Sequence, residues 1–213
     1  MCFSAESSIL SFSVGMVSSI LCILLGKSSD RIVGYFFGFI SLMQLIDYLL
    51  WTHQTCDNYN KIISILGMIL NHLQPIVLGF IVLSVNDNIP YKNRNIIIAM
   101  MIIYLIVIIP YSFEYLKSKT KQCTIKGEEH YLLWNWNMLE YTGYVYTVFI
   151  TTFCIIFLHA FQKSRTGIMA CLITIITYTT TSFFYKKEYI GTIWCYYSAF
   201  IPFIYYLNRC LSY

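Results

Sequence analysis

The distribution of apolar residues constrains this chain most strongly, because they gather into seven segments of about 17 to 23 residues each. A helix rises 1.5 Å per residue, so about 20 apolar residues cross the roughly 30 Å hydrocarbon core of a bilayer. With 58% hydrophobic and only 11% charged residues, the chain lacks the polar side chains that a soluble surface needs. We therefore expect an all-α polytopic membrane protein embedded in a lipid bilayer.

The seven expected helices form a single bundle and a single domain, residues 1–213, because we find no internal repeat, linker or composition boundary. Their expected ranges are about 9–25, 32–51, 62–83, 96–113, 139–161, 167–185 and 189–207. The first segment lacks the basic n-region and cleavage site of a signal peptide, so we expect it to be retained. Lys27 and Arg31 follow it, which favours an N-terminus outside and a C-terminus inside.

Small residues recur along the first two expected helices. One face of the first helix carries Ser11, Gly15, Ser18 and Cys22. The second helix contains the pattern Gly34-x-x-x-Gly38. Helices in lipid approach one another closely along such faces, because no hydrophobic force drives them together. We expect these faces to pack helices within the bundle, and they also offer a surface for a homo-oligomer.

The most informative polar residues are Gln44, Asp47 and Trp51, which are spaced i, i+3 and i+7 in the second expected helix. On a helix of 3.6 residues per turn they project in nearly one direction. A central Asp costs about 2.5 to 3.5 kcal/mol on membrane-insertion scales, so it is normally buried in the bundle, paired or functional. We therefore expect Asp47 to face the bundle interior.

Other polar residues at membrane depth are expected to join this site. The third expected helix carries Asn71, His72, Gln74 and Pro75 near its middle. Pro75 lacks a backbone N–H and leaves a carbonyl in the preceding turn without its usual donor, which predicts a kink with local polar contacts. The fifth expected helix begins near Glu140, a second membrane carboxylate, and we place Asn137, Glu140, Tyr141 and Tyr144 on one of its faces.

We expect Asp47 to contact the third or fifth helix and to lie within one water of Glu140, Asn71 or His72. The candidate binding site therefore comprises Gln44, Asp47, Trp51, Asn71, His72, Gln74, Glu140, Tyr141 and Tyr144. On the favoured orientation this site lies in the outer half of the membrane.

The one long connection, residues 114–137, carries four lysines, Cys123 and the pair Trp134 and Trp136. Tryptophans beside a membrane-spanning segment are typical of an interfacial anchor. Cys56 and Cys123 lie in loops on the same predicted side, and we expect a disulfide between them if that side faces an oxidising compartment. The other cysteines are scattered without a CxxC pair, which argues against a disulfide scaffold.

Three functional classes remain open. In the first, the polar site binds or conducts a small solute or protons, and Asp47 and Glu140 titrate. The second is a membrane metal hydrolase with Asp47, His72, Glu140 and Cys2 as weak candidate ligands, although the sequence has no HExxH motif. The third is a non-catalytic structural or interaction protein, for which the small-residue faces suffice.

Several other ligands are not expected. A retinal Schiff base needs a lysine in the last helix, and residues 189–207 contain none. The sequence has neither a GxxxxGK phosphate loop nor a basic patch with interleaved aromatics, so nucleotides and nucleic acids are not expected partners.

Three motifs together resemble a family of microbial multi-pass membrane proteins whose chains begin with MCFSA. They are the opening Met-Cys-Phe-Ser-Ala, the spacing Gln44-x-x-Asp47-x-x-x-Trp51 and the pair Gln74-Pro75. That family usually has Glu at the position of Asp47 and often Trp at the position of Gln74. The resemblance implies a multi-pass architecture and marks Cys2, Gln44, Asp47, Trp51 and Pro75, but it implies no particular activity.

Overall fold

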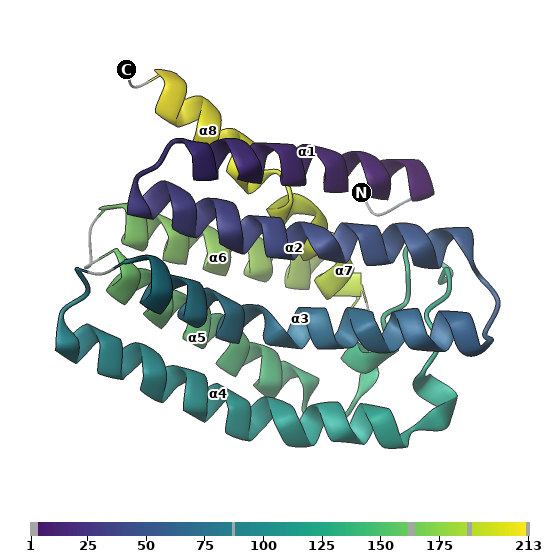
Figure 1. The fold of residues 1–213 in the computed structure, drawn as a ribbon. Coiled ribbons are helices and arrows are strands. Elements are labelled where there is room, and N and C mark those ends of the chain that lie inside the picture. Colours follow the sequence, from purple (N-terminus) through teal and green to yellow (C-terminus); the bar gives the residue numbers. More distant parts are fainter. Residues whose placement is uncertain (1–3, 87, 162–164, 187–188, 212–213) are drawn as a thin grey trace.

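The computed structural model describes residues 4–86, 88–161, 165–186 and 189–211, which form long helices packed side by side (Figure 1). The helices are α1 (Ala5–Leu24), α2 (Ser28–Thr52), α3 (Asn58–Val85), α4 (Tyr91–Lys117), α5 (Thr142–Ala160), α6 (Arg165–Phe184), α7 (Ile190–Ser198) and α8 (Ile201–Leu211). Two short 3-10 helices, η1 (Lys119–Lys121) and η2 (Asn135–Met138), lie between α4 and α5. These residues contain no strand, only an isolated bridge between Lys126 and Leu132.

Seven segments of the described chain are long and apolar enough to cross a membrane, namely α1 to α6 and the combined segment Ile190–Leu211. This confirms the predicted all-α class with seven membrane-length helices. The helices extend past the apolar segments because polar residues cap them. Ser4 accepts from the Ser7 backbone N–H while the Ser7 hydroxyl accepts from the Ser4 N–H, and Asp57 accepts from the Asn60 N–H at the start of α3.

The two ends of the bundle differ in structure. One end, called the loop end here, holds the start of α1, the 53–57 turn and the long 118–141 loop (Figure 1). The opposite end, called the far end, holds the α1–α2 and α3–α4 connections and the C-terminal end of α8. The N-terminal end of α1 and the long loop therefore share one end of the bundle.

The small-residue faces pack helices against each other inside the chain. A Cβ added to Gly34 would lie 2.6 Å from the Ser19 carbonyl oxygen of α1, and one added to Gly15 would overlap the Ser41 side chain of α2. The same face of α1 meets α8, where the Cys22 thiol donates to the Pro202 carbonyl at 3.4 Å. The expected role of these residues in close helix contact is confirmed.

The last membrane-length segment is two helices rather than one. α7 ends at Ser198, α8 begins at Ile201, and Pro202 lies in the first turn of α8. Proline is tolerated there because the first turn of a helix makes no use of its backbone donors. Figure 1 shows α8 bending away from α7, so the helix expected over residues 189–207 is broken before Pro202.

Candidate functional site

Asp47 lies inside the bundle, as its spacing predicts. Its side chain is fully buried, and its Oδ1 accepts a hydrogen bond from the indole Nε1 of Trp134 at 3.1 Å. One turn deeper, the fully buried Gln44 accepts a hydrogen bond at Oε1 from the Ser11 hydroxyl of α1 at 2.8 Å. The Gln44 and Asp47 side of α2 therefore faces α1 and the long loop.

The partner of Asp47 comes from the long loop, which enters the bundle. Trp134 and Trp136 are fully buried and stack with ring centroids 4.8 Å apart. Space for them is made by two glycines: a Cβ on Gly191 of α7 would lie 2.9 Å from the Trp134 ring, and one on Gly67 of α3 would lie 3.2 Å from Trp136. The prediction that these tryptophans anchor the protein at the membrane interface is wrong, because they pack inside the protein.

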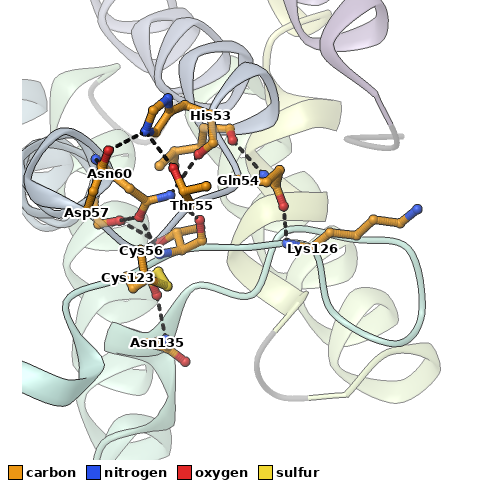
Figure 2. The surroundings of a disulfide bond; sticks show 12 residues. His53, Gln54, Thr55, Cys56, Asp57, Asn60, Cys123, Lys126 and Asn135 are labelled. Carbon is orange, nitrogen blue, oxygen red and sulfur yellow. Dashed lines mark hydrogen bonds and ion pairs between the residues drawn. A yellow bond between two sulfur atoms is a disulfide. The ribbon is translucent and has the colours of Figure 1, made fainter.

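A disulfide and an asparagine fasten the loop to the start of α3. Cys56 and Cys123 are bonded with Cα atoms 5.4 Å apart, which confirms the predicted disulfide (Figure 2). The buried Asn60 amide donates to the Thr124 carbonyl at 2.8 Å, and its Oδ1 accepts from the Thr124 backbone N–H at 2.9 Å. The paired hydrogen bonds imitate a β-bridge, so the loop keeps its backbone satisfied as it turns inward.

A second set of polar groups holds η2 between α3, α4 and α5. The Asn71 amide donates to the Tyr146 hydroxyl at 2.8 Å, and Tyr146 donates to Asn137 Oδ1 at 2.6 Å. The Tyr111 hydroxyl donates to the Trp136 carbonyl at 2.5 Å and lies 2.7 Å from the Thr142 hydroxyl. The Tyr111 bond satisfies one carbonyl of the inserted backbone, and the other bonds satisfy buried side chains against each other.

The two remaining polar residues of α3 point to different neighbours. His72 places Nδ1 2.8 Å from the Ser112 hydroxyl of α4, and its backbone carbonyl accepts from Tyr104 at 2.8 Å. The Gln74 amide donates to the Cys195 thiol of α7 at 3.8 Å, and Gly191 of the same helix lies against the Trp134 ring that binds Asp47. Gln74 is therefore on the Asp47 side of α3, whereas His72 faces α4.

The structure separates Glu140, Tyr141 and Tyr144 from the buried site. α5 begins at Thr142, Tyr141 has a left-handed backbone with φ of 62°, and all three side chains are exposed. Asn137 is buried in η2, so these four residues do not share a helical face. The expectation that Glu140 approaches Asp47 is wrong, because the chain turns outward between η2 and α5. Trp51 is half-buried and packs against the core.

The candidate metal ligands do not form a metal site in the part of the chain that the structure describes. Among those residues, no group of three His, Cys, Asp or Glu side chains is placed to hold an ion. His72 faces Ser112, Glu140 is exposed and Asp47 contacts Trp134, so the three expected ligands point to different surroundings. Cys2 lies outside the described residues.

A buried ion pair at the far end is absent from the sequence-based predictions. Asp30, in the first turn of α2, is fully buried and accepts from Arg209 Nε at 3.2 Å and from the Tyr205 hydroxyl at 2.6 Å. Tyr205 and Arg209 lie four residues apart on α8, so they face the same direction. The sequence contains both the four-residue spacing of Tyr205 and Arg209 and an acidic residue at a helix start. No local pattern connects them, because Asp30 and Arg209 are 179 residues apart in the chain.

Comparison of the chain with known protein family models, with curated proteins and with solved structures finds no match. The resemblance to the family that begins with MCFSA therefore stays a prediction from its motifs. The fold defines a class of protein, a helical bundle with seven segments able to cross a membrane. Its buried polar residues are covered by an inserted loop.

Proposed function

We propose that this protein binds protons at Asp47 and conducts them across the membrane through the polar site at the loop end. The observation that carries the proposal is the buried Asp47 carboxylate held by the Trp134 indole inside a bundle of membrane-length helices. Ionisable residues at such positions mark ion and proton pathways more often than they serve packing. The buried side chains of Gln44 and Gln74 lie on the same side as Asp47, and their amide groups can both donate and accept hydrogen bonds.

The packing around Asp47 favours protons over a larger solute. Trp134 contacts Trp136, and it leaves too little room for even a methyl group at Gly191. A solute would have to displace this inserted segment, which the disulfide and Asn60 hold in place. A proton needs no cavity, only a chain of groups that exchange hydrogen bonds.

We infer that the loop end faces the oxidising side of the membrane, since the Cys56–Cys123 disulfide lies there. This agrees with the orientation favoured by Lys27 and Arg31, with the N-terminus outside. Asp47 would then take up protons from the outer side.

The test is proton flux into proteoliposomes that contain a pH-sensitive dye, after an imposed pH step. Asp47→Asn keeps the size of the side chain but removes its titration, so we expect it to abolish the flux. Infrared difference spectra of the same samples across a pH titration should contain a carboxyl band that disappears in Asp47→Asn.

The matched control is Glu140→Gln, which makes the same carboxyl-to-amide change at an exposed residue. It should leave both the flux and the Asp47 band unchanged. Undiminished flux in Asp47→Asn, or absence of flux in the wild-type protein, would refute the proposal.

A further inference from the structure

A cavity of about 420 Å³ lies away from Asp47, on the side of the bundle where α2, α5, α6, α7 and α8 meet. Aromatic rings form most of its wall, among them Phe36 of α2, Phe153 of α5 and Trp194 of α7. Thr177 of α6 and Ile204 of α8 line it from the other sides. Its volume falls within the roughly 300 to 1,000 Å³ that small-molecule sites occupy.

Several polar side chains of the wall form hydrogen bonds within the protein. The Trp194 indole donates to the Thr177 hydroxyl at 3.0 Å, and the Thr174 hydroxyl donates to the Ala170 carbonyl at 2.8 Å. The Ser198 hydroxyl donates to the Trp194 carbonyl at 2.9 Å. The wall therefore presents mainly hydrocarbon and aromatic surface, which suits a ligand that needs no hydrogen bonds.

The cavity opens sideways between α6 and α8. Both helices line it, yet they are not among the helix pairs that pack extensively against each other. Ile173 of α6 is 43% exposed and Ile204 of α8 is 63% exposed, although both line the cavity. In a membrane, an apolar opening on the side of the bundle faces lipid rather than water.

The depth of the opening suits a lipid tail from the leaflet at the far end. Arg165, exposed at the start of α6, marks that end, and eight residues at 1.5 Å each place Ile173 about 12 Å farther along the helix. Half of the hydrocarbon core is about 15 Å thick, so the opening lies within the tail region of one leaflet. The Arg165 guanidinium complements an anionic headgroup at the surface.

We propose that this cavity binds one acyl chain of an anionic phospholipid, which enters between α6 and α8 with its headgroup near Arg165. The break between α7 and α8 is part of the site, because Ser198, Phe200 and Ile201 around the break line the cavity. The site is distinct from Asp47, and its occupation does not depend on proton binding.

The test uses the protein in nanodiscs doped with phosphatidylglycerol that carries a photoactivatable group in its acyl chain. After illumination, mass spectrometry of peptides should locate the label on residues 173–177 of α6 and 200–204 of α8. Ile204→Trp narrows the opening at an exposed position, so it should reduce this labelling about tenfold, equivalent to about 1.4 kcal/mol of binding free energy. Phosphatidylcholine with the same labelled chain should label these residues less strongly.

The matched control is Ile106→Trp, the same change on the lipid-facing side of α4, where Ile106 is also strongly exposed. It should leave the labelling of α6 and α8 unchanged. If α4 around Ile106 is labelled as strongly as the cavity residues, the label comes only from the lipid that surrounds the whole protein. That result would overturn the proposed site. Equal labelling by both headgroups would overturn the assignment of an anionic lipid.

Discussion

The hydrogen bond between Trp134 and Asp47 makes a quantitative prediction for a double-mutant cycle. Trp134→Phe removes the donor and keeps an aromatic ring, while Asp47→Leu removes the acceptor with a side chain of similar size. The bond is fully buried and its Nε1 to Oδ1 distance is 3.1 Å. We expect the stabilities of the two single variants and the double variant to be non-additive, since the two groups contact each other directly.

The size of the coupling reports the charge of Asp47. A hydrogen bond to a charged group contributes about 1.5 to 3 kcal/mol, whereas a neutral bond between membrane helices averages about 0.6 kcal/mol. We therefore expect a coupling energy of about 1.5 kcal/mol or more where Asp47 is ionised, falling toward about 0.6 kcal/mol once the pH is low enough to protonate it.

The assay is equilibrium unfolding in mixed micelles at several pH values, followed by far-ultraviolet circular dichroism so that the lost tryptophan does not affect the signal. The control cycle pairs Asp47→Leu with Trp194→Phe, because Trp194 donates to Thr177 instead. That cycle should be additive within about 0.5 kcal/mol. A Trp134 and Asp47 coupling no larger than the control at any pH would refute the interaction and the role assigned to the loop.

Three further predictions concern the two ends of the bundle. Cys56→Ser opens a disulfide that joins positions 67 residues apart, so it should cost about 4 kcal/mol of unfolding free energy, measured under oxidising conditions. Arg209→Met leaves the buried Asp30 without its cation and should cost about 3 to 5 kcal/mol, most of it recovered by adding Asp30→Asn. The Asn60 backbone N–H holds the pKa of Asp57 below its usual value of 3.8, so this cap stabilises α3 above about pH 4 and loses its effect as the pH falls through the lowered pKa. Hydrogen-exchange protection of the first turn of α3, relative to the intrinsic exchange rate at each pH, should fall in that range.

Each of these predictions has a matched control in the chain. Cys210→Ser removes an exposed free thiol and should leave stability unchanged. Arg94→Met removes an exposed far-end cation and should cost far less than Arg209→Met. Asp57→Asn keeps a capping oxygen and should abolish the pH dependence of exchange protection. If a stability control costs as much as its test variant, or if Asp57→Asn keeps the wild-type pH dependence of protection, the corresponding contact does not make the contribution predicted for it.

The fold was largely predictable from the sequence because membrane-spanning helices leave a strong signal. Hydrophobic length alone gives the number of membrane-length segments, since hydrocarbon forces each backbone to satisfy itself within its own segment. The interior position of Asp47 also followed from energetics, because its side chain could not face lipid without cost. The disulfide was predictable as a pairing of two loop cysteines, although its geometry was not.

The insertion of the long loop was not predictable, because tryptophan suits both an interface and a protein interior. Trp134 and Trp136 carry no local pattern that separates these two places. Tertiary contacts decide between the two places. Gly67 and Gly191 leave room for the rings, and Asn60 pairs with the Thr124 backbone. The exposure of Glu140 was not predictable for a similar reason. The sequence predicts a helix from about residue 139, whereas α5 begins at Thr142 and the backbone before it turns outward.

The two buried carboxylates of α2 differ in the groups that hold them, which bears on the proposed proton site. Asp30 accepts hydrogen bonds from Arg209 and Tyr205, so it is one half of a buried ion pair with a guanidinium cation. Asp47 accepts from the Trp134 indole, a neutral donor that can bond either to a carboxylate oxygen or, more weakly, to the carbonyl oxygen of the protonated acid. The Asp47 contact can therefore survive uptake and release of a proton, whereas the Asp30 contacts hold α8 against the start of α2. We accordingly expect Asp30→Asn to lower stability without removing proton flux, and Asp47→Asn to remove the flux while the fold persists. The opposite pattern in the proteoliposome assay would place the working carboxylate at the far end.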